Sequence, residues 1–265
     1  MGDWPAVLTG GQVLTTTVSA QSSASANTKG AWVQAFTAAA NTRDSILCGS
    51  LNIAGATNYL LDIGIGAAGS EVAVIDNVMM NNALANHANN PYCFPLIIQA
   101  GQRIACRVQS IAGSQWSDIS FYLIPVSAGL IAGLQKCDTY GVNTADSGGT
   151  SIDPGATAYT KGAWVQLTAS SLRPHSAIVI GASNQDNKTR AYSFWQIDVG
   201  LTSAKNTIIG NYVVRSHEND DAIYPFVSMP FPVSIPAGTE IWVRASCNIN
   251  DATDRLLDVA LYCFG

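Results

Sequence analysis

The sequence predicts an all-β protein made of two similar halves, and three observations lead to this prediction. Short segments rich in Val, Ile, Trp, Tyr and Phe alternate with clusters of Gly, Asn, Pro and Ser about every ten residues, which is typical of β-sandwiches and barrels. Helical signals are weak: the best of them, 81–90, is rich in Asn and is followed by Pro91, so we expect a loop there. Finally, most of the chain occurs twice in the same order.

The repeat is carried by one heptapeptide and by later motifs in the same order. Thr28–Gln34, with the sequence TKGAWVQ, recurs letter for letter as Thr160–Gln166. Three further pairs of segments match: Leu61–Ile65 with Ile197–Leu201, Phe94–Gly101 with Phe231–Gly238, and Asp118–Tyr122 with Asp258–Tyr262. The offset grows slowly along the chain, which indicates small loop insertions between matching elements. We therefore predict an internal duplication, with a first lobe at 1–125, a connector at 126–136 and a second lobe at 137–265.

Each lobe is predicted to contain eight strands, which is the number in a jelly roll. In the first lobe we expect strands at 13–18, 31–37, 45–53, 58–65, 71–79, 94–98, 102–110 and 117–125. In the second lobe we expect them at 137–142, 162–169, 175–182, 191–201, 206–214, 229–235, 239–248 and 256–264. The connector is too apolar for a free tether, so we expect it to pack against one lobe or both. The predicted fold is two tandem antiparallel jelly-roll-like β-sandwiches.

The composition disfavours several classes of protein. Charged residues make up 12% of the chain, against about 25% in a typical soluble domain, and the net charge is −5. Without a basic stripe, we expect no nucleic acid as a partner. No stretch approaches the roughly 18 apolar residues of a membrane span, and the first residues lack the basic and apolar regions of a signal peptide. We therefore expect a protein made in the cytoplasm, with no membrane as a partner.

The cysteines carry no recognisable metal or redox motif. They form no CxxC pair and no His/Cys cluster, and they are Cys48, Cys93, Cys106, Cys137, Cys247 and Cys263. Half of them lie within apolar runs and the others border loops. We interpret them as free buried thiols, with disulfides or a metal site as the alternatives.

Catalytic motifs fail when their context is considered. The glycine pattern at 64–69 has dinucleotide-binding spacing but is followed by another predicted strand instead of a helix, so we expect an ordinary β-turn. His87, His175 and His217 form no HExxH motif, and the chain has no GxSxG nucleophile motif. A Ser/His/Asp set assembled only in space stays open. We predict no enzymatic activity, no cofactor and no catalytic metal.

Two acidic loops occur only in the second half, at 217–221 and 248–254. Calcium takes six to eight oxygen ligands, and oxygen-rich loops at one end of a sandwich can supply them. Neither loop has the spacing of an EF-hand, so solvated loops are the favoured interpretation and calcium is the alternative.

Two tryptophans and two lysines of the repeated heptapeptide are the candidate binding or interface residues. An exposed indole of Trp32 or Trp164 would stack on a sugar ring, although a buried or interface role is favoured. The alternation of residues at 163–167 directs Trp164 outward, whereas the direction of Trp32 stays open. Lys29 and Lys161 are expected in solvated turns, with contacts in an assembly as the alternative.

Two aspartates are predicted to form structural ion pairs. Asp62 and Asp198 lie within apolar strands, where a lone carboxylate is costly to bury. Arg107 and Arg244 recur at matching places in the two halves. We predict that Asp62 pairs with Arg107 and that Asp198 pairs with Arg244, as structural pairs and not as a catalytic dyad.

The tandem β-sandwich pattern, with the segment Ile235–Arg244 (IPAGTEIWVR), resembles accessory virion proteins of tailed bacteriophages. These include head decoration or cement proteins, head-spike bases, and tail or receptor-binding components. The resemblance implies a non-enzymatic structural protein, synthesised in the host cytoplasm, that binds other virion proteins. It also implies a symmetric homo-oligomer on the particle, for which we favour a trimer.

Alternative functions come from other classes of protein. The first alternative is a carbohydrate- or receptor-binding module of a tail or head fibre, with a host surface glycan as its partner. A glycan hydrolase is disfavoured, because its chemistry needs a carboxylate pair that the sequence does not reveal. A cupin is disfavoured because its metal-binding histidine pattern is absent.

Overall fold

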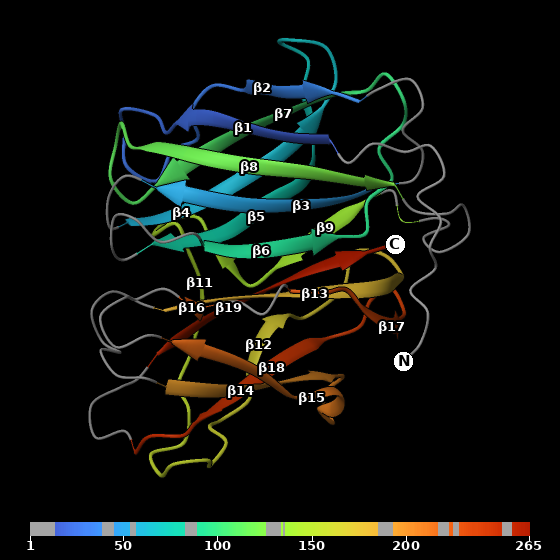
Figure 1. The fold of residues 1–265 in the computed structure, drawn as a ribbon. Helices are drawn as coiled ribbons and strands as arrows, with labels where there is room; N and C mark the ends of the chain where they lie inside the picture. The colour runs from blue at the N-terminus through green and yellow to red at the C-terminus, as the bar shows by residue number, and fades with distance from the viewer. Residues whose placement is uncertain are drawn as a thin grey trace, which may run out of the picture.

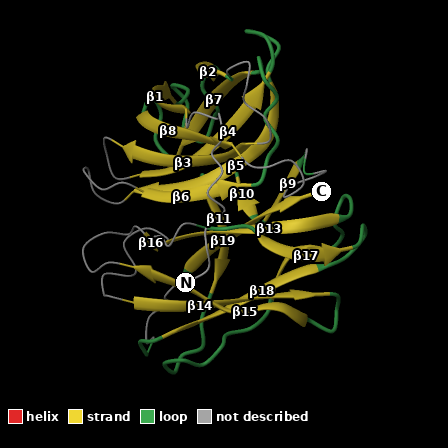
Figure 2. Ribbon diagram, turned by 45° about the vertical axis from the view of Figure 1, so that its right-hand side comes forward, coloured by secondary structure: helices red, strands yellow, loops and turns green. Residues whose placement is uncertain are grey.

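The structure is a computed structural model of the 265-residue chain. It describes residues 14–38, 45–53, 57–82, 89–125, 134, 136–184, 193–216, 223–224, 228–250 and 256–265. Within these ranges the regular elements are all β-strands (Figure 2), which confirms the predicted fold class. The described residues contain no helix that is long and apolar enough to cross a membrane.

The first lobe is a sandwich of two antiparallel sheets (Figure 1). Its strands are β1 (Leu14–Gln21), β2 (Val33–Thr37), β3 (Ser45–Ile53), β4 (Thr57–Ile65), β5 (Val72–Asn82), β6 (Asn89–Phe94), β7 (Arg103–Ser110) and β8 (Trp116–Pro125). One sheet has the order β1-β8-β3-β6 and the other has the order β2-β7-β4-β5. This alternation of strands between two sheets is the arrangement of a jelly roll.

The second lobe repeats this strand order and adds short strands. Its strands are β9 (Cys137–Tyr140), β10 (Val142–Asn143), β11 (Gly148–Ile152), β12 (Val165–Thr168), β13 (His175–Asn184), β14 (Ser193–Leu201), β15 (Asn206–Ser216), β16 (Ile223–Tyr224), β17 (Phe231–Ile235), β18 (Ile241–Cys247) and β19 (Leu257–Phe264). One sheet has the order β10-β11-β19-β13-β17, with β9 also paired to β19, and the other has the order β12-β18-β14-β15-β16. The order therefore matches that of the first lobe, and origin by duplication stays a prediction.

The position of one strand differs from the sequence prediction, and the short strands β11 and β16 were not predicted. The strand expected at 94–98 lies instead at Asn89–Phe94, partly within the segment expected to be a loop. Pairing with β3 stabilises this Asn-rich strand, and the chain leaves the ladder at Pro95, which has no N–H to donate. Strand β11 (Gly148–Ile152) was not expected, because its Gly, Ser and Thr residues resemble a turn and only its pairing with β19 makes it a strand.

The central strands β13 and β19 of one sheet lie between the two cores (Figure 1). Every residue of β19 is buried. Its side chains alternate between the cores: Leu257, Val259, Leu261 and Cys263 pack in the second lobe, and Ala260, Tyr262 and Phe264 pack in the first. The two lobes therefore share this sheet and form one continuous block.

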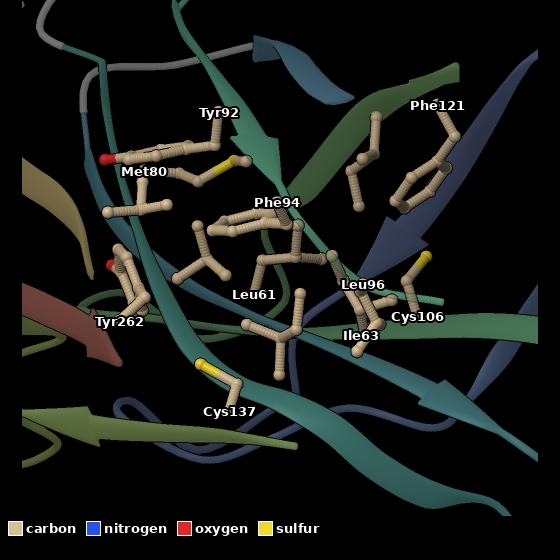
Figure 3. Packing of buried hydrophobic residues seen from close by; sticks show 14 of the residues in the cluster. Leu61, Ile63, Met80, Tyr92, Phe94, Leu96, Cys106, Phe121, Cys137 and Tyr262 are labelled. Carbon is tan, nitrogen blue, oxygen red and sulfur yellow. The ribbon is translucent and has the colours of Figure 1, made fainter. Parts of the chain in front are cut away.

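Aromatic residues join the two lobes (Figure 3). Tyr262 of β19 lies edge-on to Tyr92 and Phe94 of β6, with ring centroids 5.7 and 5.6 Å away. The backbone N–H of Met79 donates a hydrogen bond to the Tyr262 hydroxyl at 2.6 Å, and the Tyr92 hydroxyl donates to the Met79 carbonyl at 2.9 Å. The core of the first lobe thus includes residues beyond 137. The predicted lobe limits do not separate two independent cores.

The connector and the cysteines complete the core. Within the connector, only residues 134 and 136 are described, and Leu134 packs against the core of the first lobe. The side chain of Cys48 lies outside the described residues. The other five cysteines are buried, and Cys106, Cys137, Cys247 and Cys263 are free thiols, which confirms our interpretation for these four. Burial raises the pKa of Cys106 to about 12, so this thiol stays protonated at neutral pH.

Candidate functional site

Each lobe carries the same four residues on the outer face of one sheet, and we call each set a Lys–Asp–Arg–Trp network. The lysine and tryptophan precede β2 or β12, the aspartate lies in β4 or β14, and the arginine lies in β7 or β18. The two networks are Lys29, Asp62, Arg107 and Trp32 in the first lobe, and Lys161, Asp198, Arg244 and Trp164 in the second.

In the first lobe, Asp62 accepts hydrogen bonds from three donors. Lys29 Nζ and the backbone N–H of Asn77 donate to Oδ1 at 2.6 and 2.8 Å, and Arg107 Nε donates to Oδ2 at 2.8 Å. Asn77 lies at a bulge of β5 with a φ of 58°, which turns its N–H towards the carboxylate. Burial lowers the pKa of Lys29, and the opposing attraction of Asp62 does not fully offset this effect.

The second network reproduces the first. Lys161 Nζ and the N–H of Asn211 donate to Asp198 Oδ1, each at 2.8 Å, and Arg244 Nε donates to Oδ2 at 2.9 Å. Burial by itself would raise the pKa of Asp198. Hydrogen bonds from Lys161, from the N–H of Asn211 and from Arg244 outweigh that effect, so the pKa is lowered below its ordinary value.

Each tryptophan of the networks packs against its own lobe. The guanidinium carbon of Arg107 lies 4.5 Å from the centroid of the Trp32 ring, and Arg244 lies at the same distance from Trp164. This geometry is a cation–π contact, and it covers one face of each indole. A Cβ built on Gly64 would lie 2.7 Å from the Trp32 ring, so the glycine makes room for the indole. Trp32 therefore points outward, as Trp164 does.

The glycine of the repeated heptapeptide also has a structural role. A Cβ on Gly30 would collide with the carbonyl oxygen of Gln21, and a Cβ on Gly162 would collide with that of Asp153. The N–H groups of these glycines donate to the carbonyls of Val108 and Ala245 at 2.8 and 2.9 Å. In both lobes, the glycine of the heptapeptide packs closely against the neighbouring backbone, and its lysine binds the buried carboxylate.

The structure brings together both predicted Asp–Arg pairs and adds a partner to each. Lys29 and Lys161 were expected in solvated turns, but their side chains are only 17% exposed and bind the carboxylates. The recurrence of a lysine and an aspartate in both halves was the available signal, although 33 residues separate Lys29 from Asp62 and 37 separate Lys161 from Asp198. A binding role for Trp32, Trp164 and the two lysines stays a prediction.

His175 belongs to a separate buried network at the start of β13. Its Nε2 lies 3.1 Å from the Tyr140 hydroxyl and 3.7 Å from Asp138 Oδ2. Arg173 donates to both oxygens of Asp138, at 2.6 and 2.9 Å. Burial lowers the pKa of His175, with Asp138 opposing this effect and Arg173 adding to it. His87 and His217 lie outside the described residues, as do the loop at 217–221 and residues 251–254.

Among the described residues, no group of three or more His, Cys, Asp or Glu side chains is placed to hold a metal ion.

Apolar side chains are exposed on the second lobe, where Tyr159 is 68%, Phe194 49% and Val213 41% exposed. We call these three residues the second-lobe patch. They line a groove of about 230 Å³ together with Gln196, Ser246 and Cys247. Alternation with the core residue Trp195 was a readable signal that Phe194 faces outward.

Two aromatic residues are exposed on the first lobe. Trp116 is 53% and Tyr122 38% exposed, and both lie on the outer face of β8. We call this surface the β8 face. Trp116 also borders a second groove of about 310 Å³ that includes Lys29 and Gly30. These two aromatic surfaces were not among the predicted site residues.

The fold and the networks define the chain as a protein of two tandem jelly-roll sandwiches. No protein-family model and no curated protein sequence matches it.

Solved structures with a similar arrangement include PNGF-II, with a TM-score of 0.41 and 10% identity over 96% of this chain and 65% of that chain. PNGase F, a glycosylasparaginase from Flavobacterium meningosepticum, has a TM-score of 0.31 and 9% identity over 94% of each chain. The STIV MCP has a TM-score of 0.33 and 8% identity over 96% of each chain. These likenesses concern the β-architecture alone.

Proposed function

We propose that this chain is a non-enzymatic structural protein of a virion, attached to the particle as a decoration, cement or spike-base component. The observation that carries the proposal is a double sandwich with aromatic side chains exposed on two separate sheet faces, the second-lobe patch and the β8 face. Exposed apolar surface of this kind marks sites of protein–protein contact. One face then serves the particle or a neighbouring copy, and the other serves a further copy or partner.

The acidic and basic groups of the networks support a structural role. Asp62 and Asp198 each accept three hydrogen bonds, and their side chains are 2% and 6% exposed. A carboxylate held in this way has little access to a substrate, which favours a structural role.

Binding to particles tests the proposal. Purified protein is added to particles of its virus that lack it, and the mixture is sedimented. We expect saturable binding at a fixed ratio to the capsid proteins, and no additional binding to particles that already carry the protein. Absence of binding to depleted particles would count against a virion role. Native mass spectrometry of the protein is expected to give a symmetric oligomer, with a trimer favoured.

A carbohydrate- or receptor-binding module is the second candidate, and the groove beside Phe194 favours it. Tyr159 and Phe194 present aromatic rings there, next to the amide of Gln196 and the hydroxyl of Ser246. Aromatic rings with adjacent hydrogen-bonding groups suit the apolar and hydroxyl faces of a sugar. A glycan array that binds the protein and loses its signal with Phe194→Ala would support this candidate.

A further inference from the structure

The first lobe contacts the second through one end of the outer face of the sheet β2-β7-β4-β5. Asn58, Leu60, Met79 and Gln109 lie on this face, and each is at most 8% exposed. The second lobe covers them: Gln109 Nε2 donates to the Thr144 carbonyl at 3.0 Å, and a Cβ built on Gly149 would lie 2.6 Å from Met79 Sδ.

The second lobe contributes the outer face of β19 to this contact. Tyr262 is the central residue, because its hydroxyl accepts a hydrogen bond from the Met79 N–H and lies 3.4 Å from the Asn77 carbonyl oxygen. Ala260 and Phe264 flank it on the same face and pack in the core of the first lobe. The contact therefore joins the outer face of the sheet β2-β7-β4-β5 in the first lobe to the outer face of β19 in the second lobe.

The covered surface of the first lobe has an uncovered counterpart in the second. The matched networks set the correspondence: Asn58 and Asp62 match Phe194 and Asp198, two positions on each strand that share a face. In the adjacent strand, Asn77 and Asn211 bind these aspartates, so Met79 matches Val213. In contrast to Asn58 and Met79, Phe194 and Val213 are exposed, by 49% and 41%.

The β19 face likewise has an uncovered counterpart. Tyr262 lies four residues after Asp258 in β19, as Tyr122 lies four residues after Asp118 in β8, and both strands hold the same place in the strand order. Tyr262 is fully buried by the first lobe, whereas Tyr122 is 38% exposed. Each lobe therefore exposes one surface whose counterpart in the other lobe is buried in the contact between the lobes.

We propose that the second-lobe patch of one copy binds the β8 face of a second copy, in the placement that joins the two lobes within the chain. In this contact Tyr122 meets Val213 as Tyr262 meets Met79. Because the two surfaces differ, the contact is head-to-tail, and it closes into a ring or continues as a filament according to its rotation. The inference deepens the proposed function, on whose self-assembly it rests, by naming the surfaces.

One difference between the two halves fits this contact. In the internal contact, the hairpin of β10 and β11 reaches the first lobe, where Ser147 donates to Asn27 Oδ1 at 2.7 Å. The first lobe has the uninterrupted strand β1 in place of this hairpin. At the positions of Asn27 and Asn58 the second lobe has the larger residues Tyr159 and Phe194. In the proposed contact between copies, these aromatic side chains would fill the space that the β10–β11 hairpin fills in the internal contact.

Sedimentation velocity over a range of micromolar concentrations tests self-association. We expect the unaltered protein to associate. Val213→Glu should raise the dissociation constant by about tenfold or more, as expected for a residue at the centre of an interface. Val72→Glu is the matched control, because Val72 is 65% exposed and lies outside both surfaces. It should associate like the unaltered protein. Unchanged thermal unfolding of each variant establishes that it is folded.

Mixing two variants tests the head-to-tail pairing. Val213→Glu and Tyr122→Glu each remove one surface, so each alone should be monomeric. Their mixture should form a heterodimer, because the intact β8 face of the first variant meets the intact patch of the second. A monomeric unaltered protein, association that survives Val213→Glu, or a mixture without heterodimers would overturn the inference.

Separate readouts distinguish the two proposals. Particle binding by a protein that does not self-associate would sink this inference and leave the virion role standing. Self-association that follows the expected pattern, without particle binding, would do the reverse. A strictly monomeric protein that binds a glycan in the groove of Phe194 would overturn the docking and favour the carbohydrate-binding candidate.

Discussion

At the scale of single residues, a buried carboxylate in each lobe binds a lysine, an arginine and a backbone N–H. Asp62 and Asp198 are predictable from sequence because they interrupt apolar strands and because an arginine recurs at a matching place. Their lysine partners were not predicted, since a lysine beside a glycine is typical of a solvated turn. Only the folded path of that turn, which brings Lys29 Nζ within 2.6 Å of Asp62, reveals the third member.

Asp198→Ala is expected to lower the free energy of unfolding by about 3–5 kcal/mol, because it leaves Lys161 and Arg244 without their buried partner. Urea denaturation measures the change. Lys205→Ala is the control: it removes a cation that lies over Trp242, and it should cost about 1 kcal/mol or less. Equal losses for the two variants would show that the network is not important for stability.

Since the folded pKa of Asp198 is lowered, the stability that this carboxylate contributes is present above the ordinary pKa of 3.8 and is lost as the pH falls through the folded pKa.

His175 predicts a second pH dependence, at higher pH. Its folded pKa lies below the ordinary value of 6.5, so the unfolded chain binds more protons between these two values. Stability is therefore fully present above 6.5 and decreases as the pH falls from 6.5 towards the folded pKa. Urea denaturation at pH 7.5 and pH 5.5, both values chosen about one unit from 6.5, should show this loss, and His175→Gln should reduce it. The same pH dependence in both proteins would rule out His175 as its cause.

At the scale of elements, we expect removal of the tyrosine hydroxyl to destabilise the protein by different amounts on the matching strands β19 and β8. Tyr262→Phe removes the partner of the Met79 N–H inside the block, and we expect a loss of about 1–3 kcal/mol in the free energy of unfolding. Tyr122→Phe changes the same atom at the corresponding place on β8, where the ring is exposed, and should cost less than about 0.5 kcal/mol in the monomer. Chemical denaturation of both variants checks the contrast. A cost for Tyr122→Phe equal to that for Tyr262→Phe would contradict the assignment of β19 as the shared strand.

The strands that could be predicted are those whose alternation or apolar content is strong. β4, β14 and β18 have apolar residues on one face and the network residues on the other, so their sequences indicate both the strand and its orientation. β6 and β11 could not be predicted, because their Asn, Gly and Ser residues do not favour a strand and only pairing with neighbouring strands makes them strands.

Burial between the lobes could not be predicted either. The outer positions of β4 and β5 appear solvent-facing from alternation alone, and only the packing of the second lobe explains why Leu60 and Met79 are apolar. The exposed patch was accessible in part, because Phe194 alternates with core residues of β14. Its meaning depends on the comparison between the two lobes in three dimensions.

At the scale of the whole molecule, the shared sheet predicts cooperative unfolding. β19 is in the middle of both cores, so neither lobe retains its packing when the other unfolds. Differential scanning calorimetry should show a single transition whose calorimetric and van't Hoff enthalpies agree. Two separated transitions would mean that the lobes fold as independent units.

The central claim is that this double sandwich is a component of a virion, and the composition of purified particles tests it most directly. Virus particles are purified on a density gradient from infected cells that produce the chain, and their proteins are quantified by mass spectrometry. We predict that the chain copurifies with the capsid proteins at a constant ratio across the particle peak. A chain that is abundant in infected cells and absent from the particle peak would contradict the claim.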